Sequence, residues 1–94
     1  MATYVILSKL TDEGRKTIKN NPNRIFEVNR ELEQMGVKVK EQFALLGPYD
    51  FLNIVEAPDN ESIMRMSIEL GSRGSVQLLS LAAVPVSEIG KIIK

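Results

Sequence analysis

Hydrophobic residues along this chain follow two different periods, and each change of period marks the end of one predicted element. Residues 3–8 form a nearly continuous apolar and β-branched run, which is typical of a strand covered on both faces. Residues 37–46 begin with strict alternation and end apolar, as in a strand that runs from a solvated end into a buried one. Residues 51–56 follow a tight turn and are expected to pair with that strand, and residues 76–84, rich in valine, leucine and alanine, form a fourth.

Helical periodicity fills the intervals between these strands. Thr11 caps a short helix with an acidic first turn, and residues 24–35 repeat apolar side chains three and four positions apart, which predicts an amphipathic helix. Asp59 caps a further helix, which the glycines of residues 71–74 end. The inner side of this helix is expected to hold Ile63, Met64, Met66, Ser67 and Leu70. Residues 86–94 have the pattern of a short amphipathic helix whose apolar side needs a cover.

The order strand, helix, strand, strand, helix, strand predicts an α+β fold, the ferredoxin-like βαββαβ sandwich with a four-stranded antiparallel sheet and a short C-terminal helix. At 94 residues the chain is expected to be a single domain, residues 1–94. The helices would cover one face of the sheet, so the second face also needs a cover. The residues expected on the second face are Tyr4, Ile6, Leu52, Ile54, Leu79 and Leu81. Face-to-face pairing of two chains would bury them.

Three short motifs in order resemble one family, the GYD domain proteins. The first is the turn Gly47-Pro48-Tyr49-Asp50 between the second and third strands, and the others are Val-Glu-Ala-Pro-Asp at residues 55–59 and Leu-Gly-Ser-Arg-Gly-Ser-Val at residues 70–76. The resemblance covers nearly the whole chain and implies a ferredoxin-like fold that pairs as a dimeric α/β barrel, without implying a reaction. The same hairpin resembles the effector-binding domain of the Lrp/AsnC regulators. Because their DNA-binding helix-turn-helix is absent from this chain, that resemblance implies only a stand-alone effector-binding module.

Charge and composition exclude several classes of function. The 12 basic and 12 acidic residues balance to a net charge of +0 and are interspersed, so no basic field is available for nucleic acid. The apolar N-terminal run lacks a basic flank and is too short to span a bilayer, so we expect no membrane contact and a cytoplasmic location. The chain contains no cysteine and no histidine, which excludes an imidazole base, a thiolate nucleophile and haem ligation. We therefore expect no cofactor and no metal site, and a homo-oligomer that supplements the small core.

The candidate binding residues are polar or aromatic side chains in apolar surroundings. Amides on a sheet face orient small ligands, aromatic side chains wall a cavity, and an arginine between two glycines contacts anions. A tyrosine beside a carboxylate is suited to acid–base work, although turn chemistry alone also explains that pair. The candidates are Tyr4 and Phe43 as walls, Tyr49 and Asp50 at the turn, Asn53 and Gln77 as amides, and Arg73.

Three functions are consistent with this pattern. We expect a small homo-oligomeric protein that binds a small molecule in a cavity between paired sheets. The first alternative is a cofactor-independent enzyme of the dimeric α/β barrel kind, and the second is a structural subunit that assembles with itself without a ligand. The residues alone do not name a ligand or substrate.

Overall fold

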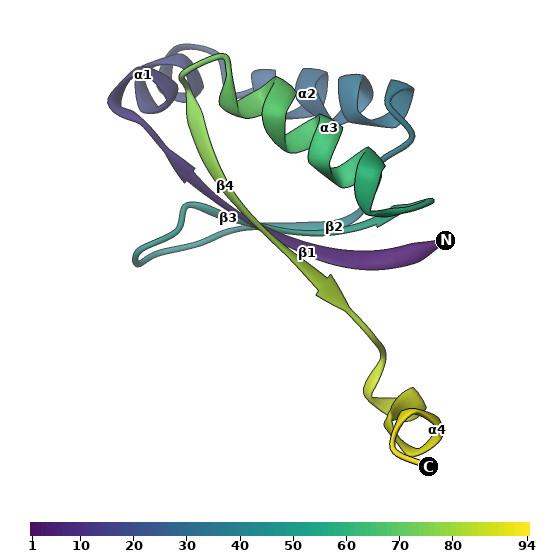
Figure 1. The fold of residues 1–94 in the computed structure, drawn as a ribbon. Coiled ribbons are helices and arrows are strands. Elements are labelled where there is room, and N and C mark those ends of the chain that lie inside the picture. Colours follow the sequence, from purple (N-terminus) through teal and green to yellow (C-terminus); the bar gives the residue numbers. More distant parts are fainter.

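The computed structural model describes all 94 residues and confirms the ferredoxin-like α+β fold with its short C-terminal helix (Figure 1). The elements are β1 (Ala2–Leu10), α1 (Asp12–Asn20), α2 (Arg24–Gln34), β2 (Lys38–Ala44), β3 (Phe51–Ala57), α3 (Asn60–Gly71), β4 (Val76–Ala83), the 3₁₀ turn η1 (Val86–Glu88) and α4 (Ile89–Ile92). The four strands lie in the order β2-β3-β1-β4, and every neighbouring pair is antiparallel. None of the helices is long and apolar enough to cross a membrane.

The helices are divided unequally between the two sides of the sheet. Figure 1 shows α1, α2 and α3 on one side, whereas β4 continues past the sheet and places α4 on the other side, away from the body of the molecule. The molecule is accordingly elongated, with extents of 50 × 29 × 19 Å. One face of the sheet is therefore covered by helices, and the other is left open.

The strand register assigns each side chain to one of these faces. Tyr4 lies opposite Val55 and Ile6 opposite Asn53, and both Tyr4 and Ile6 are buried against the helices. We call the opposite side of the sheet the open face. Its large apolar residues are Val5, Leu7, Phe43, Leu52, Ile54, Leu79 and Leu81.

The predicted open face was right for β3 and β4 and wrong for β1. Tyr4 and Ile6 point to the helices, and Val5 and Leu7 take the expected places on the open face. Alternation shows which face of a strand is the buried one only where the residues on the other face are polar. Residues 3–8 are almost all apolar, so their pattern does not show which face of β1 is exposed.

A β-bulge in β2 changes the facing of the residues that follow it. Val39 lies opposite Val55, but Glu41 lies opposite Ile54, so Lys40 is an extra residue without a partner in β3. Continued alternation from Val39 would turn residue 41 inward. The bulge instead places Gln42 on the helix face and Phe43 on the open face.

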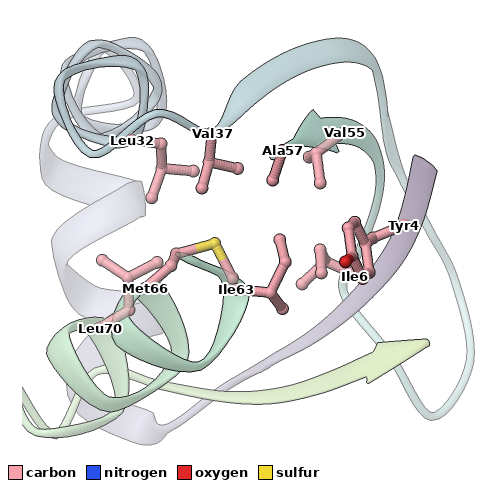
Figure 2. Packing of buried hydrophobic residues seen from close by; sticks show 9 residues of the cluster. All are labelled: Tyr4, Ile6, Leu32, Val37, Val55, Ala57, Ile63, Met66 and Leu70. Carbon is pink, nitrogen blue, oxygen red and sulfur yellow. The ribbon is translucent and has the colours of Figure 1, made fainter. Parts of the chain in front are cut away.

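The buried core lies between the sheet and the helices and is drawn in Figure 2. It comprises Tyr4, Ile6, Leu32, Val37, Val55, Ala57, Ile63, Met66 and Leu70. The end of α2 shows how local geometry brings two of these residues together. Gly36 takes a left-handed φ of 86°, and the amide of Val37 then donates to the carbonyl of Leu32 at 2.9 Å. This is the Schellman arrangement, which pairs Leu32 with Val37 at the edge of the core.

Helix α3 has the predicted cap and most of the predicted inner side. Asp59 accepts a hydrogen bond from the amide of Ser62 at 2.9 Å, and the pKa of its carboxyl is held low chiefly by this bond. Ile63, Met66 and Leu70 are buried as expected. Met64 is exposed, because it lies only one position from Ile63 and one helical step is about 100°. The predicted inward position of Met64 is therefore wrong.

Candidate functional site

A cavity of about 330 Å³ separates part of the sheet from the helices. We call it the helix-side cavity. Most of its wall is apolar and comes from β1, β3, β4, α2 and α3, including Ile6, Val28, Leu32, Val55, Met66 and Leu78. The helix side of the sheet thus holds a partly open, mostly apolar recess within a single chain.

Three amide side chains from three different elements meet at the wall of this cavity, and we call them the amide cluster. Asn29 on α2 donates to the Oε1 atom of Gln42 at 2.8 Å, and Gln42 Nε2 donates back to Asn29 Oδ1 at 3.2 Å. Gln42 Nε2 also donates to Asn53 Oδ1 at 2.7 Å. Asn53 Nδ2 makes only longer contacts, 3.4 Å each, with the carbonyl of Ile6 and the hydroxyl of Ser8. The three amides and Ser8 all line the cavity.

Two arginines line the cavity, and both form ion pairs with glutamates. Arg24 Nη1 lies 3.2 Å from carboxylate oxygens of Glu27 and Glu31, and Arg73 Nη2 lies 2.6 Å from Glu31 Oε2. The hydrogen bond from Arg73, together with the charges of Arg73 and Arg24, holds the pKa of Glu31 below its usual value of 4.5. The loop after α3 is therefore tied to α2 through Glu31.

We predict that Glu31→Gln changes how stability depends on pH. Since the folded-state pKa of Glu31 is depressed, its contribution is complete above the unfolded value of 4.5 and is lost as pH falls through the folded value. For a partly exposed network we expect about 1 kcal/mol at pH 7. The measurement is the free energy of unfolding in urea, determined for the wild-type protein and for Glu31→Gln from pH 7 to pH 3. The wild-type advantage should shrink toward zero in acid, and a difference that stays constant with pH would contradict the prediction.

The open face of the sheet is the second candidate site. Its centre is apolar, whereas Lys9, Lys38, Glu41 and Glu56 face the same side near its edges. An apolar centre inside a charged rim is the composition of a protein–protein interface. The C-terminal arm, residues 84–93, extends on this side of the sheet, and its exposed apolar residues are Val84, Val86, Ile89, Ile92 and Ile93.

A shallow hollow lies at one end of the open face. Its lining includes the predicted residues Tyr49 and Gln77, together with Lys9, Pro48 and Leu79. The structure thus brings Tyr49 and Gln77 together at the hairpin end of the sheet. Lys9 is the charged group within this hollow.

Asp50 fastens the β2–β3 hairpin to β1. Its Oδ2 atom accepts a hydrogen bond from the amide of Leu10 at 2.7 Å and lies 4.0 Å from Arg15 Nη2. Its own amide donates to the carbonyl of Ser8 at 2.8 Å. Both the main chain and the carboxylate of Asp50 are therefore used in holding the turn.

The predicted site residues fall on both sides of the sheet. Asn53 and Arg73 line the helix-side cavity, Tyr49 and Gln77 share the hollow, and Phe43 is exposed on the open face. Tyr4 is buried, and its hydroxyl donates to Asn60 Oδ1 at 2.6 Å. Tyr4 and Phe43, expected to wall one cavity, point to opposite faces. Whether any of these residues binds a ligand stays a prediction.

Sequence reasoning missed Ser8, Asn29 and Gln42 as neighbours of Asn53. Gln42 was hidden by the bulge, since alternation places it on the other face. Asn29 belongs to an amphipathic helix, where one amide looks like an ordinary solvated position. The signal in the sequence that could have indicated this cluster was Gln42, a polar residue close to the apolar end of its strand.

Comparison with known proteins identifies relatives over nearly the whole chain. The family model described as GYD domain matches residues 4–93. A protein of Thermus thermophilus, named "Glutamine synthetase and cystathionine beta-lyase binding protein", is 51% identical over 90 residues, which are 95% of this chain and 95% of that protein.

Solved structures show the same fold. The crystal structure of MtbAldR matches with a TM-score of 0.67 and 20% identity over 88% of this chain and 51% of that chain, so this chain spans about half its length. TTHA0845 from Thermus thermophilus matches with a TM-score of 0.57 and 20% identity, over 92% of this chain and 96% of that one. A hypothetical protein from Pyrococcus horikoshii gives a TM-score of 0.57 and 22% identity, over 95% of this chain and 96% of that one. At these low sequence identities, the structural matches establish the fold alone.

Proposed function

This chain belongs to the GYD domain family, and on that premise we propose that it is a homo-oligomeric protein-binding protein. Two copies pair through the open faces of their sheets, and the assembly binds other proteins through its outer surface. The single observation that carries the proposal is the open face itself. Its large apolar side chains lie beside one another on neighbouring strands, none of the helices on the other side of the sheet covers them, and Phe43, Leu79 and Leu81 are exposed.

The area of the open face can be compared with the area that a stable dimer buries. Strands of about seven residues, spaced 4.8 Å apart in a four-stranded sheet, present roughly 19 × 23 Å, or about 440 Å² in projection. A standard interface buries about 800 Å² on each partner. Because protruding side chains make the accessible area larger than the projected area, the sheet alone supplies at least about half of that area. The C-terminal arm lies on the same side and supplies more apolar surface, so in the proposed pair each arm packs against the other copy.

Pairing through the sheets leaves the helices facing outward. On α3, Met64 and Ile68 are 64% and 71% exposed and lie one turn apart, and Phe26 on α2 is also exposed. Two exposed apolar side chains that are neighbours on one helix face are suited to contact another protein. The relative of 51% identity is named for binding two enzymes, glutamine synthetase and cystathionine beta-lyase. We propose that enzymes of this kind bind the outer face of α3.

The test is binding of the purified chain to glutamine synthetase and to cystathionine beta-lyase from the same organism, measured by biolayer interferometry. The wild-type protein is expected to bind at least one of them. Ile68→Asp should weaken that binding at least tenfold, because it places a charge in an apolar contact. Asn20→Asp, which adds the same charge at the exposed end of α1, serves as the control.

The two parts of the proposal fail separately. If wild-type protein binds neither enzyme, the enzyme-binding part is wrong, whatever its assembly state. If Ile68→Asp binds as tightly as Asn20→Asp, the outer face of α3 is not the docking surface. The mass of the assembly tests pairing independently of both results.

Small-molecule binding is a second candidate function, and the helix-side cavity is the observation that favours it. The sequence predicts a cavity between paired sheets, whereas this volume lies within one chain, on the other side of the sheet. A ligand site there also suits the stand-alone effector-binding module that the Lrp/AsnC resemblance implies. For the enzyme alternative, the carboxylate of the proposed acid–base pair is already engaged by Leu10 and Arg15. We therefore favour binding over catalysis.

A further inference from the structure

We propose that the helix-side cavity binds a small molecule with an apolar body and a neutral carboxamide head. The inference rests on the second candidate function, small-molecule binding in this cavity, and adds the chemical class of the ligand; the site is formed by one chain and does not need a second copy. The apolar body occupies the space between sheet and helices, and the carboxamide meets the amide cluster, Asn29, Gln42 and Asn53.

The volume and the wall suit a small ligand. About 330 Å³ lies at the lower end of the range in which proteins hold small molecules, roughly 300–1,000 Å³. Such sites are mostly apolar, with a few convergent polar groups that fix orientation. Here the apolar part comes from both layers of the fold, including Leu32 on α2 and Val55 on β3. The polar part is concentrated in one cluster.

The amide cluster already contains the hydrogen-bond pattern that a carboxamide uses. Asn29 and Gln42 form a reciprocal pair in which each amide donates to the other's oxygen, at 2.8 and 3.2 Å. Asn53 joins the pair by accepting from Gln42 at 2.7 Å. A ligand carboxamide, which has both donors and an acceptor, would extend this network by the same geometry.

Asn53 supplies the unused hydrogen-bonding capacity. Its Nδ2 atom bears two N–H groups, and its contacts to Ile6 and Ser8 are 3.4 Å, longer than the usual range of about 2.7–3.2 Å. Hydrogen bonds of that length are weak, so each N–H group can still donate to a better placed acceptor in the cavity while Oδ1 keeps its bond from Gln42. The carbonyl oxygen of the ligand amide is such an acceptor.

The charges at the cavity favour a neutral ligand over an anion. Arg24 and Arg73 are the cations of the lining, but both are neutralised by Glu31, and Arg24 also contacts Glu27. Glu13 adds a further negative charge to the lining. A carboxylate would gain little from these occupied arginines, and the carboxylates of Glu27 and Glu31 that pair with them would repel it. The polar groups left for contact are amides and hydroxyls, which pair best with a neutral head.

The bulge in β2 gives independent support to the site. Regular alternation from Val39 would expose Gln42, and the extra residue Lys40 turns it into the cavity. Bulges re-aim side chains and are frequent beside functional sites. Placing the Gln42 amide in an apolar layer costs free energy unless it is hydrogen-bonded, so apolar packing by itself does not favour this arrangement. A ligand that uses the amide gives this irregularity a role.

The experiment is a two-dimensional ¹H–¹⁵N titration of the full chain, which resolves the side-chain NH₂ signals of asparagine and glutamine. The probes are 3-phenylpropanamide and its matched anion, 3-phenylpropanoate. The amide is expected to shift the signals of Asn29, Gln42 and Asn53 saturably, and to bind at least tenfold more tightly than the anion. Those of Asn20 and Asn23, exposed and outside the cavity, should not move.

Substitution then separates a specific site from non-specific uptake into an apolar space. Asn53→Leu keeps the branched shape and the number of side-chain heavy atoms and removes the amide, so it should lower the affinity for 3-phenylpropanamide at least tenfold. Gln34→Leu removes an exposed amide from the end of α2, outside the cavity, and should leave affinity unchanged. Absence of a saturable shift in folded wild-type protein overturns the proposal. Equal affinity for amide and anion, or equal affinity in Asn53→Leu and Gln34→Leu, also overturns it.

Discussion

The double variant Leu79→Asp/Leu81→Asp is expected to be a folded monomer under conditions in which the wild-type chain is a dimer or larger assembly. Both side chains lie on β4 on the open face and are 42% and 44% exposed in the single chain. A carboxylate at either position stays solvated while the chain is alone. In a sheet-to-sheet pair it is desolvated without a partner, at a cost of several kcal/mol.

The expected effect of the double variant is large and measurable. A combined penalty of about 4 kcal/mol raises the dissociation constant about 1,000-fold. Sedimentation velocity at micromolar concentration should show one species at the monomer mass, and circular dichroism should show the native helix content. Ile68→Asp, which adds a charge on the outer face of α3, should leave the assembly intact. If the Leu79→Asp/Leu81→Asp protein keeps the wild-type mass, the open face is not the pairing surface.

The second large effect is expected for Gly14→Ala. Alanine is the better helix former, so α1 alone would gain about 1 kcal/mol. In the folded chain, however, the added Cβ atom would clash with the carbonyl oxygen of Ser75 and would lie 3.2 Å from Leu10 Cδ2. The first contact is with backbone, so α1 has to move away from the loop before β4.

That movement breaks the contacts that dock the start of α1. The amide of Thr11 donates to the carbonyl of Ser75 at 3.1 Å, and the Thr11 hydroxyl donates to the carbonyl of Gly74 at 2.8 Å. We expect a net loss of about 2–3 kcal/mol, which lowers the Tm by roughly 10–20 °C in a domain of this size. Gly71→Ala is the matched control, because its Cβ atom meets nothing within 4 Å. Equal Tm values for the two variants would contradict the predicted clash.

The element order was predictable because each element carries its own start and stop signals. Thr11 and Asp59 cap their helices through side-chain oxygens as expected, and Gly36 ends α2 in a left-handed conformation. These signals are local, so they do not depend on tertiary contacts. They were sufficient for the fold class, which the structure confirms.

The face of the sheet to which each strand side chain points was less predictable, because it depends on strand register and on β-bulges. The apolar run of β1 does not distinguish its two faces, and the assignment of Tyr4 and Ile6 to the open face was wrong. The bulge at Lys40 inverted the facing of Gln42 and Phe43. The facing of β1 depends on pairing with β3, which is distant from β1 in the sequence, and the bulge depends on the register within the β2–β3 hairpin.

The candidate site was predictable only in part for the same reason. Asn53 drew attention because it is an amide among apolar strand residues, and it does line a cavity. Its partners Asn29 and Gln42 come from α2 and from the far side of the bulge, so no single window of sequence contains the cluster. The hairpin residue Asp50 was easier to interpret, since its turn chemistry is local and the structure places its carboxylate on the amide of Leu10.

Native mass spectrometry of the purified wild-type chain tests pairing through the open face most directly. At tens of micromolar, the proposed sheet-to-sheet pairing predicts a mass of twice the 10.5 kDa chain, or a higher even multiple. The same spectrum of the Leu79→Asp/Leu81→Asp protein should show only the single chain. A wild-type spectrum dominated by the 10.5 kDa monomer would contradict the central claim.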